Sequence, residues 1–387
     1  MQICYINPPI EYYSPVSGGA IATILMQSAK QLVKRGHYVT VLTPDKGDAV
    51  YPIGNVVPVA SPDRTEIHPL RRKLAVLKYM VSGWDYAYFE FYLRSVVKTL
   101  RTLSPAPDAV IVFNDLVTPR YVKVALPNTR TIVWLQNEAN TRMKRVETWE
   151  PSIDHFLTCS QYIKDTTVKK YGISPNKITV VHSGVDLEAF YPADDFPTPH
   201  DPIKALYIGR IDPNKGPDIA VEAVRRLRLE GVHVDLTVAG GIWYYLHGNE
   251  HEDTYLRDLT VACKTIGAAC SGHIPRPEVP ALVRDHDIAF VLSRSNEPFG
   301  LVTLEAMASG CAVIASNRGG LPESCDTGAT LLDPDDINDV VRALRNLAQN
   351  PEQLEAWKRK AVERASRASW DAVGDIFTAA VERVHAT

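Results

Sequence analysis

The sequence predicts an α/β protein composed of two doubly wound domains in series, each a parallel sheet with helices on both faces. Short apolar runs alternate with helical patterns along the chain, and a proline-rich stretch near residue 190 interrupts the alternation. This stretch, "FYPADDFPTPHDPI", has the composition of a linker. At 387 residues the chain is also too long for one ordinary core. We therefore expect domains at 1–190 and 204–365, a linker at 191–203 and a C-terminal helix at 366–387.

Strand and helix patterns alternate from the first residues of the N-terminal half. Residues 2–7 form an apolar run, which predicts a strand and not a signal peptide. The stretch "AIATILMQSAKQLVK" then has apolar residues at helical spacing, Gly36 suits the helix end, and "YVTVLT" follows as a strand. This order predicts a parallel βαβ unit, which the strand patterns "DAVIVF" and "RTIVWLQ" extend.

The C-terminal half repeats the same alternation. Its predicted strands are "KALYIG", "VDLTVAG", "IAFVLS" and "CAVIAS", and its predicted helices include "PDIAVEAVRRLRLEG", "TYLRDLTVACKTIG" and "GLVTLEAMASG". Ligands of doubly wound sheets bind beyond the carboxyl ends of the strands. We therefore expect the two sheets to face each other across a cleft, with the binding site in that cleft.

The composition excludes several classes of protein. The formal net charge of −3 lacks the basic surplus of a nucleic-acid-binding protein, so no nucleic-acid partner is expected. No apolar run approaches the roughly 18 residues of a membrane span. The six cysteines are scattered without a CxxC pair, as buried thiols of a cytoplasmic protein would be. The sequence therefore predicts a cytoplasmic protein.

Two segments have features of phosphate-binding loops. In "SGGA", Gly18 and Gly19 precede the first predicted helix, where free amides and the helix dipole favour an anion, although such glycine pairs often make only a turn. In "YIGRIDPNKGPDIA", Arg210 and Lys215 flank a turn between a strand and a helix. Two cations at this spacing can hold both phosphates of a diphosphate, although single surface cations are more often only solvated.

The stretch "SRSNEPFGLVTLEAMASG" places two glutamates around the start of a predicted helix. Glu297 lies in the loop after a buried strand and can accept hydrogen bonds from sugar hydroxyls. Glu305 lies further along the helix and suits ribose hydroxyls, although a helical glutamate is usually just solvated. The amides expected to face a second phosphate are those of Phe299, Gly300, Leu301 and Val302.

These motifs together resemble those of the retaining family 4 glycosyltransferases of GT-B fold. The resemblance rests on "GR-x4-KG", "EPFGLVTLEAMASG", "GGLPE", the early "SGG" and "HSGVDLEAFYP", and it extends over nearly the whole chain. It implies transfer of a sugar from a nucleoside diphosphate sugar, without a metal or other cofactor, to a sugar, lipid-linked or small-molecule acceptor. It also implies that the C-terminal helix crosses back to the first domain.

The resemblance also implies a role for each motif residue. Arg210 and Lys215 would hold the donor diphosphate and offset the charge on the leaving group, which explains why no metal is needed. Glu297 would contact the donor sugar, and Glu305 the ribose. His273 and Ile274 would border the nucleobase. The backbone at Gly18 and Gly19 would approach the phosphates or the acceptor.

One position departs from the family pattern. Where the family often has a histidine after "TIVWL", this sequence has Gln136, which can donate and accept hydrogen bonds but cannot carry a proton. The catalytic role of that histidine then falls to Gln136 or moves to a neighbour. A front-face mechanism, in which the leaving phosphate helps to deprotonate the acceptor, needs no enzyme base and is compatible with glutamine. On the acceptor side we expect Asn114, Asp115, Asn137 and Glu138.

Three alternative functions stay open. The segment "HGNEH" at 247–251 matches the H-x-x-E-H pattern of inverted zinc peptidases, but its glycine and asparagine are poor helix residues and no third ligand motif is found. A non-catalytic nucleotide-sugar-binding protein would keep the same donor residues. A GT-B enzyme of another reaction, an epimerase or a phosphorylase, is the third alternative, and the cofactor-lysine motif of a phosphorylase is not found.

The segment 64–101 combines a surplus of basic residues with interleaved aromatic residues. Such a segment can dock on anionic lipid, which would place the protein at the inner face of the membrane and suit a lipid-linked acceptor. The other interpretation, which we favour, is that the aromatic residues belong to the core and the charged residues are solvated.

Overall fold

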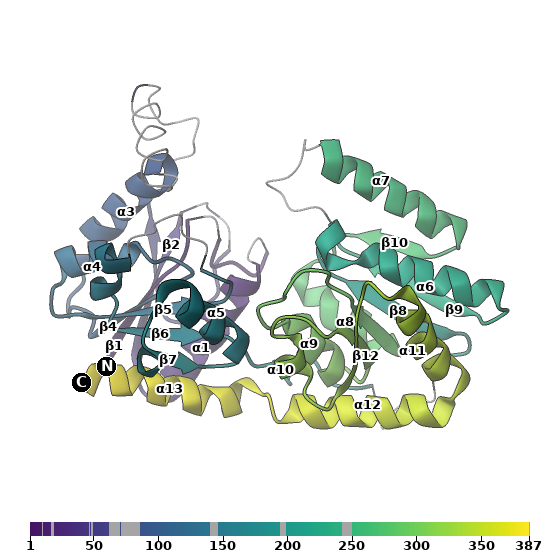
Figure 1. The fold of residues 1–387 in the computed structure, drawn as a ribbon. Helices are drawn as coiled ribbons and strands as arrows, with labels where there is room; N and C mark the ends of the chain where they lie inside the picture. Colours follow the sequence, from purple (N-terminus) through teal and green to yellow (C-terminus); the bar gives the residue numbers. More distant parts are fainter. Residues whose placement is uncertain are drawn as a thin grey trace. The chain divides into compact units, whose positions relative to one another are not determined.

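The computed structural model describes the chain apart from residues 10, 17, 18, 46, 48, 62–69, 71–85, 140–145, 194–198, 242–249 and 387. The chain divides into an N-terminal unit, Met1–His182 with Val373–Thr387, and a C-terminal unit, Ser183–Ala372. Each unit is built on a parallel sheet with helices packed against it (Figure 1). The predicted α/β class with two parallel sheets is confirmed.

The described part of the N-terminal unit contains a seven-stranded sheet in the order β3-β2-β1-β4-β5-β6-β7. Its neighbouring strands all pair in parallel, and the central strands are buried on both faces, which explains their nearly continuous apolar sequences. The strand bounds are β1 (Gln2–Ile6), β2 (Tyr38–Pro44), β3 (Asn55–Val59), β4 (Ala109–Phe113), β5 (Arg130–Leu135), β6 (His155–Thr158) and β7 (Ile178–Val180).

Helices of the N-terminal unit pack on this sheet, and their described bounds are α1 (Ala20–Lys34), α3 (Tyr86–Leu100), α4 (Thr118–Ala125) and α5 (Gln161–Tyr171). The apolar face of α1 buries side chains three and four residues apart, among them Leu25, Ala29 and Leu32. In α5, the Ser160 side chain caps the first turn and Gly172 ends the helix in the left-handed conformation, which a residue without Cβ adopts freely.

The C-terminal helix α13 (Trp370–Ala386) packs mainly within the N-terminal unit. Phe377 stacks on Trp134 of β5 with ring centroids 4.8 Å apart, and Trp134 stacks on Phe113 of β4 at 5.5 Å. Such aromatic pairs contribute about 0.5–1.5 kcal/mol beyond their area burial. Residues of the central strands β4 and β5 and of the C-terminal helix therefore share one core.

The described part of the C-terminal unit contains a six-stranded parallel sheet in the order β10-β9-β8-β11-β12-β13. Because β8 and β11 are neighbours, the loops that follow them leave the sheet side by side at its carboxyl edge. The strand bounds are β8 (Ile203–Ile208), β9 (Val234–Ala239), β10 (Ala269–Gly272), β11 (Ile288–Val291), β12 (Ala312–Ser316) and β13 (Ala329–Leu332). The helix bounds are α6 (Pro217–Leu229), α7 (Glu250–Thr265), α8 (Val279–Arg284), α9 (Leu301–Ala308), α10 (Leu321–Cys325), α11 (Ile337–Gln349) and α12 (Pro351–Ser366).

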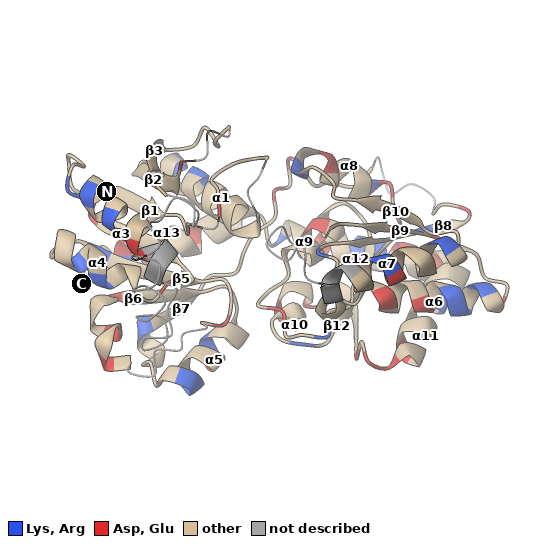
Figure 2. Cartoon of the chain, turned by 90° about the horizontal axis from the view of Figure 1, so that it is seen from above, with Lys and Arg blue, Asp and Glu red and all other residues tan. Residues whose placement is uncertain are grey.

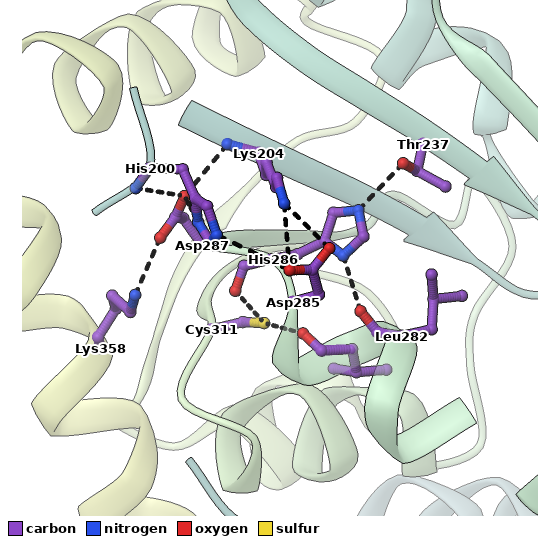
Figure 3. A network of polar contacts seen from close by, with 10 residues as sticks. His200, Lys204, Thr237, Leu282, Asp285, His286, Asp287, Cys311 and Lys358 are labelled. Carbon is purple, nitrogen blue, oxygen red and sulfur yellow. Dashed lines mark hydrogen bonds and ion pairs between the residues drawn. The ribbon is translucent and has the colours of Figure 1, made fainter. Parts of the chain in front are cut away.

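A buried polar network lies at the opposite, amino edge of the C-terminal sheet (Figure 3). Asp287, which directly precedes β11, is 1% exposed, and its Oδ1 accepts a hydrogen bond from Nζ of Lys358 on α12 at 3.0 Å. Its Oδ2 accepts hydrogen bonds from the backbone and ring nitrogens of His200 at 3.2 and 2.9 Å and from the backbone N–H of Lys204 at 3.1 Å. Asp287 therefore joins the predicted linker, two central strands and α12.

Basic and acidic residues both occur along the described elements of each unit (Figure 2). No described helix is long and apolar enough to cross a membrane. Of the predicted lipid-docking segment, residues 64–69 and 71–85 lie outside the described residues. In the described helix α3, Tyr92 is buried and its hydroxyl donates to the Asn7 carbonyl at 2.7 Å. Tyr92 is thus a core residue.

Candidate functional site

Arg210 and Lys215 lie on the turn that joins β8 to α6, at the carboxyl edge of the C-terminal sheet. The buried carboxylate of Asp212 shapes this turn. Its Oδ1 accepts a hydrogen bond from the backbone N–H of Asn214 at 2.9 Å, and its Oδ2 accepts one from Nε of Arg210 at 2.5 Å. One carboxylate therefore caps the turn and orients the guanidinium of Arg210.

The turn after β8 is held against the loop after β11. Gly216 ends the turn with φ of +68°, and a Cβ at this position would come within 2.1 Å of the Leu292 carbonyl oxygen, so only glycine fits. The backbone N–H of Arg294 donates to the Asn214 carbonyl at 2.7 Å, and its Nη1 donates to the Pro213 carbonyl at 2.7 Å. These contacts fix the two loops relative to each other.

Arg294 also forms a two-pronged ion pair with Asp218 in the first turn of α6, with Nη–Oδ distances of 2.8 and 2.6 Å. Burial alone would raise the pKa of Asp218, but hydrogen bonds from Arg294 and Tyr255 and the charge of Arg294 outweigh it, so the pKa lies below its usual value of 3.8. The loop after β11 is therefore anchored to α6 as well as to the turn.

Glu297 faces Lys215 across these two loops. The residue is 8% exposed, and its Oε1 accepts hydrogen bonds from Nζ of Lys215 and from Oγ of Ser293, both at 2.5 Å. Bonds to charged groups are short and directional, so they hold the carboxylate in one orientation. No hydrogen bond from the described residues reaches Oε2, which is available as an acceptor for a ligand hydroxyl.

The start of α9 depends on two glycines in unusual conformations. Gly300 caps the helix with φ of +92°, and a Cβ there would come within 2.5 Å of the Leu321 side chain. Gly319, with φ of +60°, lies against Glu297, where a Cβ would come within 2.3 Å of its carbonyl oxygen. The residues predicted to present amides to a phosphate all lie at this helix start: Phe299, Gly300, Leu301 and Val302.

Glu305 lies in the second turn of α9 and is 7% exposed. Both of its carboxylate oxygens accept hydrogen bonds from Arg276; Nη1 lies 3.0 Å from Oε2, and Nη2 bonds to Oε1. Arg276 follows closely after His273 and Ile274, the predicted nucleobase residues beyond β10. The segment predicted for the nucleobase is therefore joined to the predicted ribose carboxylate by an arginine.

Gln136 lies beyond the carboxyl end of β5 in the N-terminal unit. The side chain of Asn114, at the end of β4, accepts hydrogen bonds from the backbone N–H groups of Gln136 and Asn137 at 2.7 and 3.1 Å. Gln136 is 8% exposed, and its buried Nε2 has no hydrogen-bond partner among the described residues. An unsatisfied buried donor is destabilising, and a ligand oxygen would relieve that penalty.

The other predicted acceptor-side carboxylates interact within the chain. Asp115 accepts hydrogen bonds from the backbone N–H groups of Val117 and Thr118 at 2.8 and 3.2 Å, and so holds the turn that leads into α4. Burial raises the pKa of Asp115 despite these bonds. Glu138 accepts a hydrogen bond from the Tyr162 hydroxyl. Asp115 therefore shapes a helix start, and Glu138 is tied to α5.

The predicted anion contact at the start of α1 also has an internal partner. The backbone N–H of Gly19 donates to the Glu11 carboxylate at 3.1 Å, and burial raises the pKa of Glu11 against the effect of this hydrogen bond. A phosphate could use the Gly19 amide only by displacing Glu11. Gly18, the other glycine of the pair, lies outside the described residues.

The zinc hypothesis concerns residues 247–251. Of these, residues 247–249 lie outside the described residues, and α7 begins at Glu250. Within the described ranges, no group of three or more His, Cys, Asp or Glu side chains is arranged to hold a metal ion. The "HGNEH" segment itself is therefore untested as a zinc site.

The C-terminal unit brings Arg210, Lys215 and Glu297 to the same edge of its sheet, on the loops after β8 and β11. Sequence reasoning missed the side chains that orient them, although these lie inside the same motifs. The sequence does contain a feature that could have indicated them, because several charged or hydroxyl residues lie in two short loops at adjacent strand ends. The residues missed are Asp212, Arg276, Ser293 and Arg294.

Two family models match this chain in tandem. "Glycosyltransferase Family 4" matches residues 18–189, and "Glycosyl transferases group 1" matches residues 193–364. The chain belongs to glycosyltransferase family 4. The family predicted from the motifs is thereby confirmed.

Solved structures share the fold of this family 4 glycosyltransferase. Sucrose-phosphate synthase from Thermosynechococcus elongatus matches with a TM-score of 0.76 and 18% identity over 100% of both chains. HepE from Anabaena, in complex with UDP and glucose, matches with a TM-score of 0.72 and 15% identity over 99% of both chains. The predicted GT-B fold is confirmed by these likenesses.

A glycogen synthase from Mycobacterium tuberculosis (strain ATCC 25618 / H37Rv) is among the sequence relatives. It is 31% identical over 245 residues, which cover 62% of this chain and 57% of that enzyme. The chain thus spans less than two thirds of the length of the curated relatives it matches.

Proposed function

We propose that this family 4 glycosyltransferase moves a hexose-type sugar from a nucleoside diphosphate sugar to an acceptor hydroxyl, with retention of configuration at the anomeric carbon. The arrangement of Arg210, Lys215 and Glu297 on two interlocked loops carries the proposal. Two cations beside a carboxylate suit a diphosphate attached to a sugar. HepE, which shares the fold, has been solved in complex with UDP-glucose.

The cations have two roles in the proposed reaction. Arg210 and Lys215 bind the diphosphate and stabilise the negative charge that develops on it as its bond to the anomeric carbon breaks. Because Asp212 and Glu297 already orient these side chains, little reorganisation is required, and we propose that no metal takes part. The acceptor oxygen bonds to the anomeric carbon, and its proton passes to the leaving phosphate.

The acceptor is proposed to be a growing polysaccharide, a glycolipid or a small metabolite. Gln136 supports a sugar-binding role at the carboxyl edge of the N-terminal sheet, because its buried Nε2 lacks a partner among the described residues. We propose that Nε2 donates to an oxygen of the donor sugar. Glutamine supplies a hydrogen bond there without supplying a base.

Replacing Gln136 with methionine is expected to lower kcat by about tenfold, because one hydrogen bond is lost. The same change should leave thermal stability unchanged or slightly raised, because a buried unsatisfied donor is removed. Steady-state kinetics and thermal unfolding of the purified variant test both effects. Unchanged kcat would contradict a substrate contact at Gln136.

A thermal-shift titration with UDP, GDP and ADP tests the proposed donor site. A ligand at about 100 times its Kd stabilises the folded state by about 2.7 kcal/mol, so one of the three diphosphates should raise Tm visibly. Arg210→Ala should abolish that shift, and EDTA should not. If none of the three shifts Tm, the proposed donor site is contradicted.

A non-catalytic nucleotide-sugar-binding protein is the main alternative. It would show the same thermal shift with the diphosphate and with the matching sugar nucleotide. It would differ in turnover, because no diphosphate would be released when an acceptor mixture is added. Release of diphosphate that depends on the acceptor therefore decides between the two functions.

A further inference from the structure

Arg276 and Glu305 form a fork-to-fork ion pair beside the segment predicted to border the nucleobase. The guanidinium donates from two nitrogens to both oxygens of one carboxylate, with Nη1 3.0 Å from Oε2. This geometry fixes the plane of the carboxylate, which a single contact from a lysine would not do. Because a carboxylate has about four acceptor positions, the pair leaves Glu305 able to accept hydrogen bonds from a ligand.

The guanidinium of Arg276 is also positioned by an aromatic ring. It lies over the buried ring of Phe190, with 5.2 Å between Cζ and the ring centroid. Phe190 belongs to the C-terminal unit, as do both partners of the ion pair. Arg276 is therefore held by a carboxylate and by an aromatic ring, and both restrict the orientation of its fork.

We propose that Arg276 is a positioning residue that orients Glu305 to read the ribose hydroxyls of the donor, and so selects ribonucleotides over 2′-deoxyribonucleotides. This inference rests on the proposed donor site. A site built to bond a hydroxyl rejects an analogue that lacks it, because a buried polar group is then left unpaired. Such rejection requires a fixed acceptor, and the fork of Arg276 fixes the 7%-exposed carboxylate.

The test compares UDP, GDP and ADP with their 2′-deoxy analogues by calorimetric titration. For the diphosphate that binds wild-type protein, the deoxy analogue should bind about tenfold or more weakly. In Arg276→Met the ribonucleotide should bind about ten- to a hundredfold more weakly, and the ribo-to-deoxy ratio of Kd values should approach one. Arg276→Lys keeps the charge without the fork and should show an intermediate ratio.

Arg284→Met is a matched control. Arg284 lies over the ring of Tyr191 at 3.7 Å and donates to the carbonyls of Ala189 and Tyr191, so it packs on the same short segment as Arg276. Among the described residues, no hydrogen bond or ion pair joins Arg284 to Glu305. Replacing Arg284 should leave the ribo-to-deoxy ratio of Kd values at the wild-type value. If the ratio instead depended on packing near this segment in general, Arg284→Met would change it as well.

A double-mutant cycle with Glu305→Gln separates positioning from structural support. If Arg276 acts through Glu305, the ratio in the double variant should match that of either single variant. Thermal unfolding without nucleotide identifies variants that fail to fold. If both Arg276→Met and Arg276→Lys keep the wild-type ribo-to-deoxy ratio of Kd values, this inference is overturned. That result would not contradict the proposed donor site. Absence of binding of all three diphosphates to wild-type protein would overturn the donor site and the inference together.

Discussion

Replacing Arg210 with alanine should lower kcat by about 10²–10³-fold and leave the fold intact. Removing one oriented donor from a site that stabilises developing negative charge typically has an effect of this size. The fold should survive because Asp212 keeps its hydrogen bond from the Asn214 backbone N–H and still caps the turn. Steady-state kinetics with the sugar nucleotide of the diphosphate that shifts Tm measure the effect, and circular dichroism checks the fold.

Arg345→Ala is the matched control for this variant. It removes the same side chain from an exposed ion pair with Glu230, at distances of 2.7 and 2.8 Å, outside the site residues. Its kcat should equal that of the wild type, because exposed ion pairs contribute little. Glu297→Ala should lose most turnover, as Arg210→Ala does. A kcat near the wild-type value in Arg210→Ala or in Glu297→Ala would contradict the proposed site.

The grouping of Arg210, Lys215 and Glu297 was predictable because the parallel sheet imposes it. Parallel strands end at the same edge, and β8 and β11 are neighbours, so the loops that carry Lys215 and Glu297, 82 residues apart in sequence, must meet. Strand patterns and linear motifs were sufficient for that step. The sequence order alone therefore predicted that these three residues lie at one edge of the C-terminal sheet, and their role toward a donor stays a prediction.

The partners of these residues were not predictable from linear motifs. Whether Lys215 pairs with Glu297 or stays solvated depends on distances set by the Gly216–Leu292 approach and by the contacts of Arg294. Sequence patterns do not show which atoms of two loops come within about 2–3 Å of each other. Roles that rest on side-chain orientation, such as that of Arg276, follow only from the structure.

The N-terminal unit shows a different limit. Asn114 and Asp115 follow a strand, as ligand-binding residues often do, and were predicted for the acceptor side. In the structure the Asn114 side chain accepts hydrogen bonds from two backbone N–H groups, and Asp115 accepts one from the backbone N–H of Val117 in the turn before α4. Short polar side chains satisfy loop backbones and bind ligands with the same atoms, so sequence cannot separate the two roles. Their role toward an acceptor stays a prediction.

A second substitution, at the amino edge of the C-terminal sheet and far from the proposed site, is expected to have a large effect on stability. Asp287→Asn should reduce the free energy of unfolding by about 3–5 kcal/mol, because Lys358, with 5% of its side chain exposed, would keep a buried charge without its partner. The double variant Asp287→Asn/Lys358→Met should recover much of this loss, since it leaves no unpaired buried charge. Urea unfolding at pH 7 measures both changes.

The pH dependence of this effect follows from the pKa of Asp287. Burial alone would raise it, but the charge of Lys358 and hydrogen bonds from Lys204, Lys358 and His200 outweigh burial and lower it below 3.8. A carboxyl group with a lowered folded-state pKa stabilises the fold above its unfolded-state pKa and loses that contribution as pH falls through the folded-state value. The stability difference between wild type and Asp287→Asn should therefore be full at pH 7 and shrink below about pH 3.8. A difference under about 1 kcal/mol at pH 7, the range of exposed pairs, would mean that the Asp287–Lys358 pair is solvated and not buried.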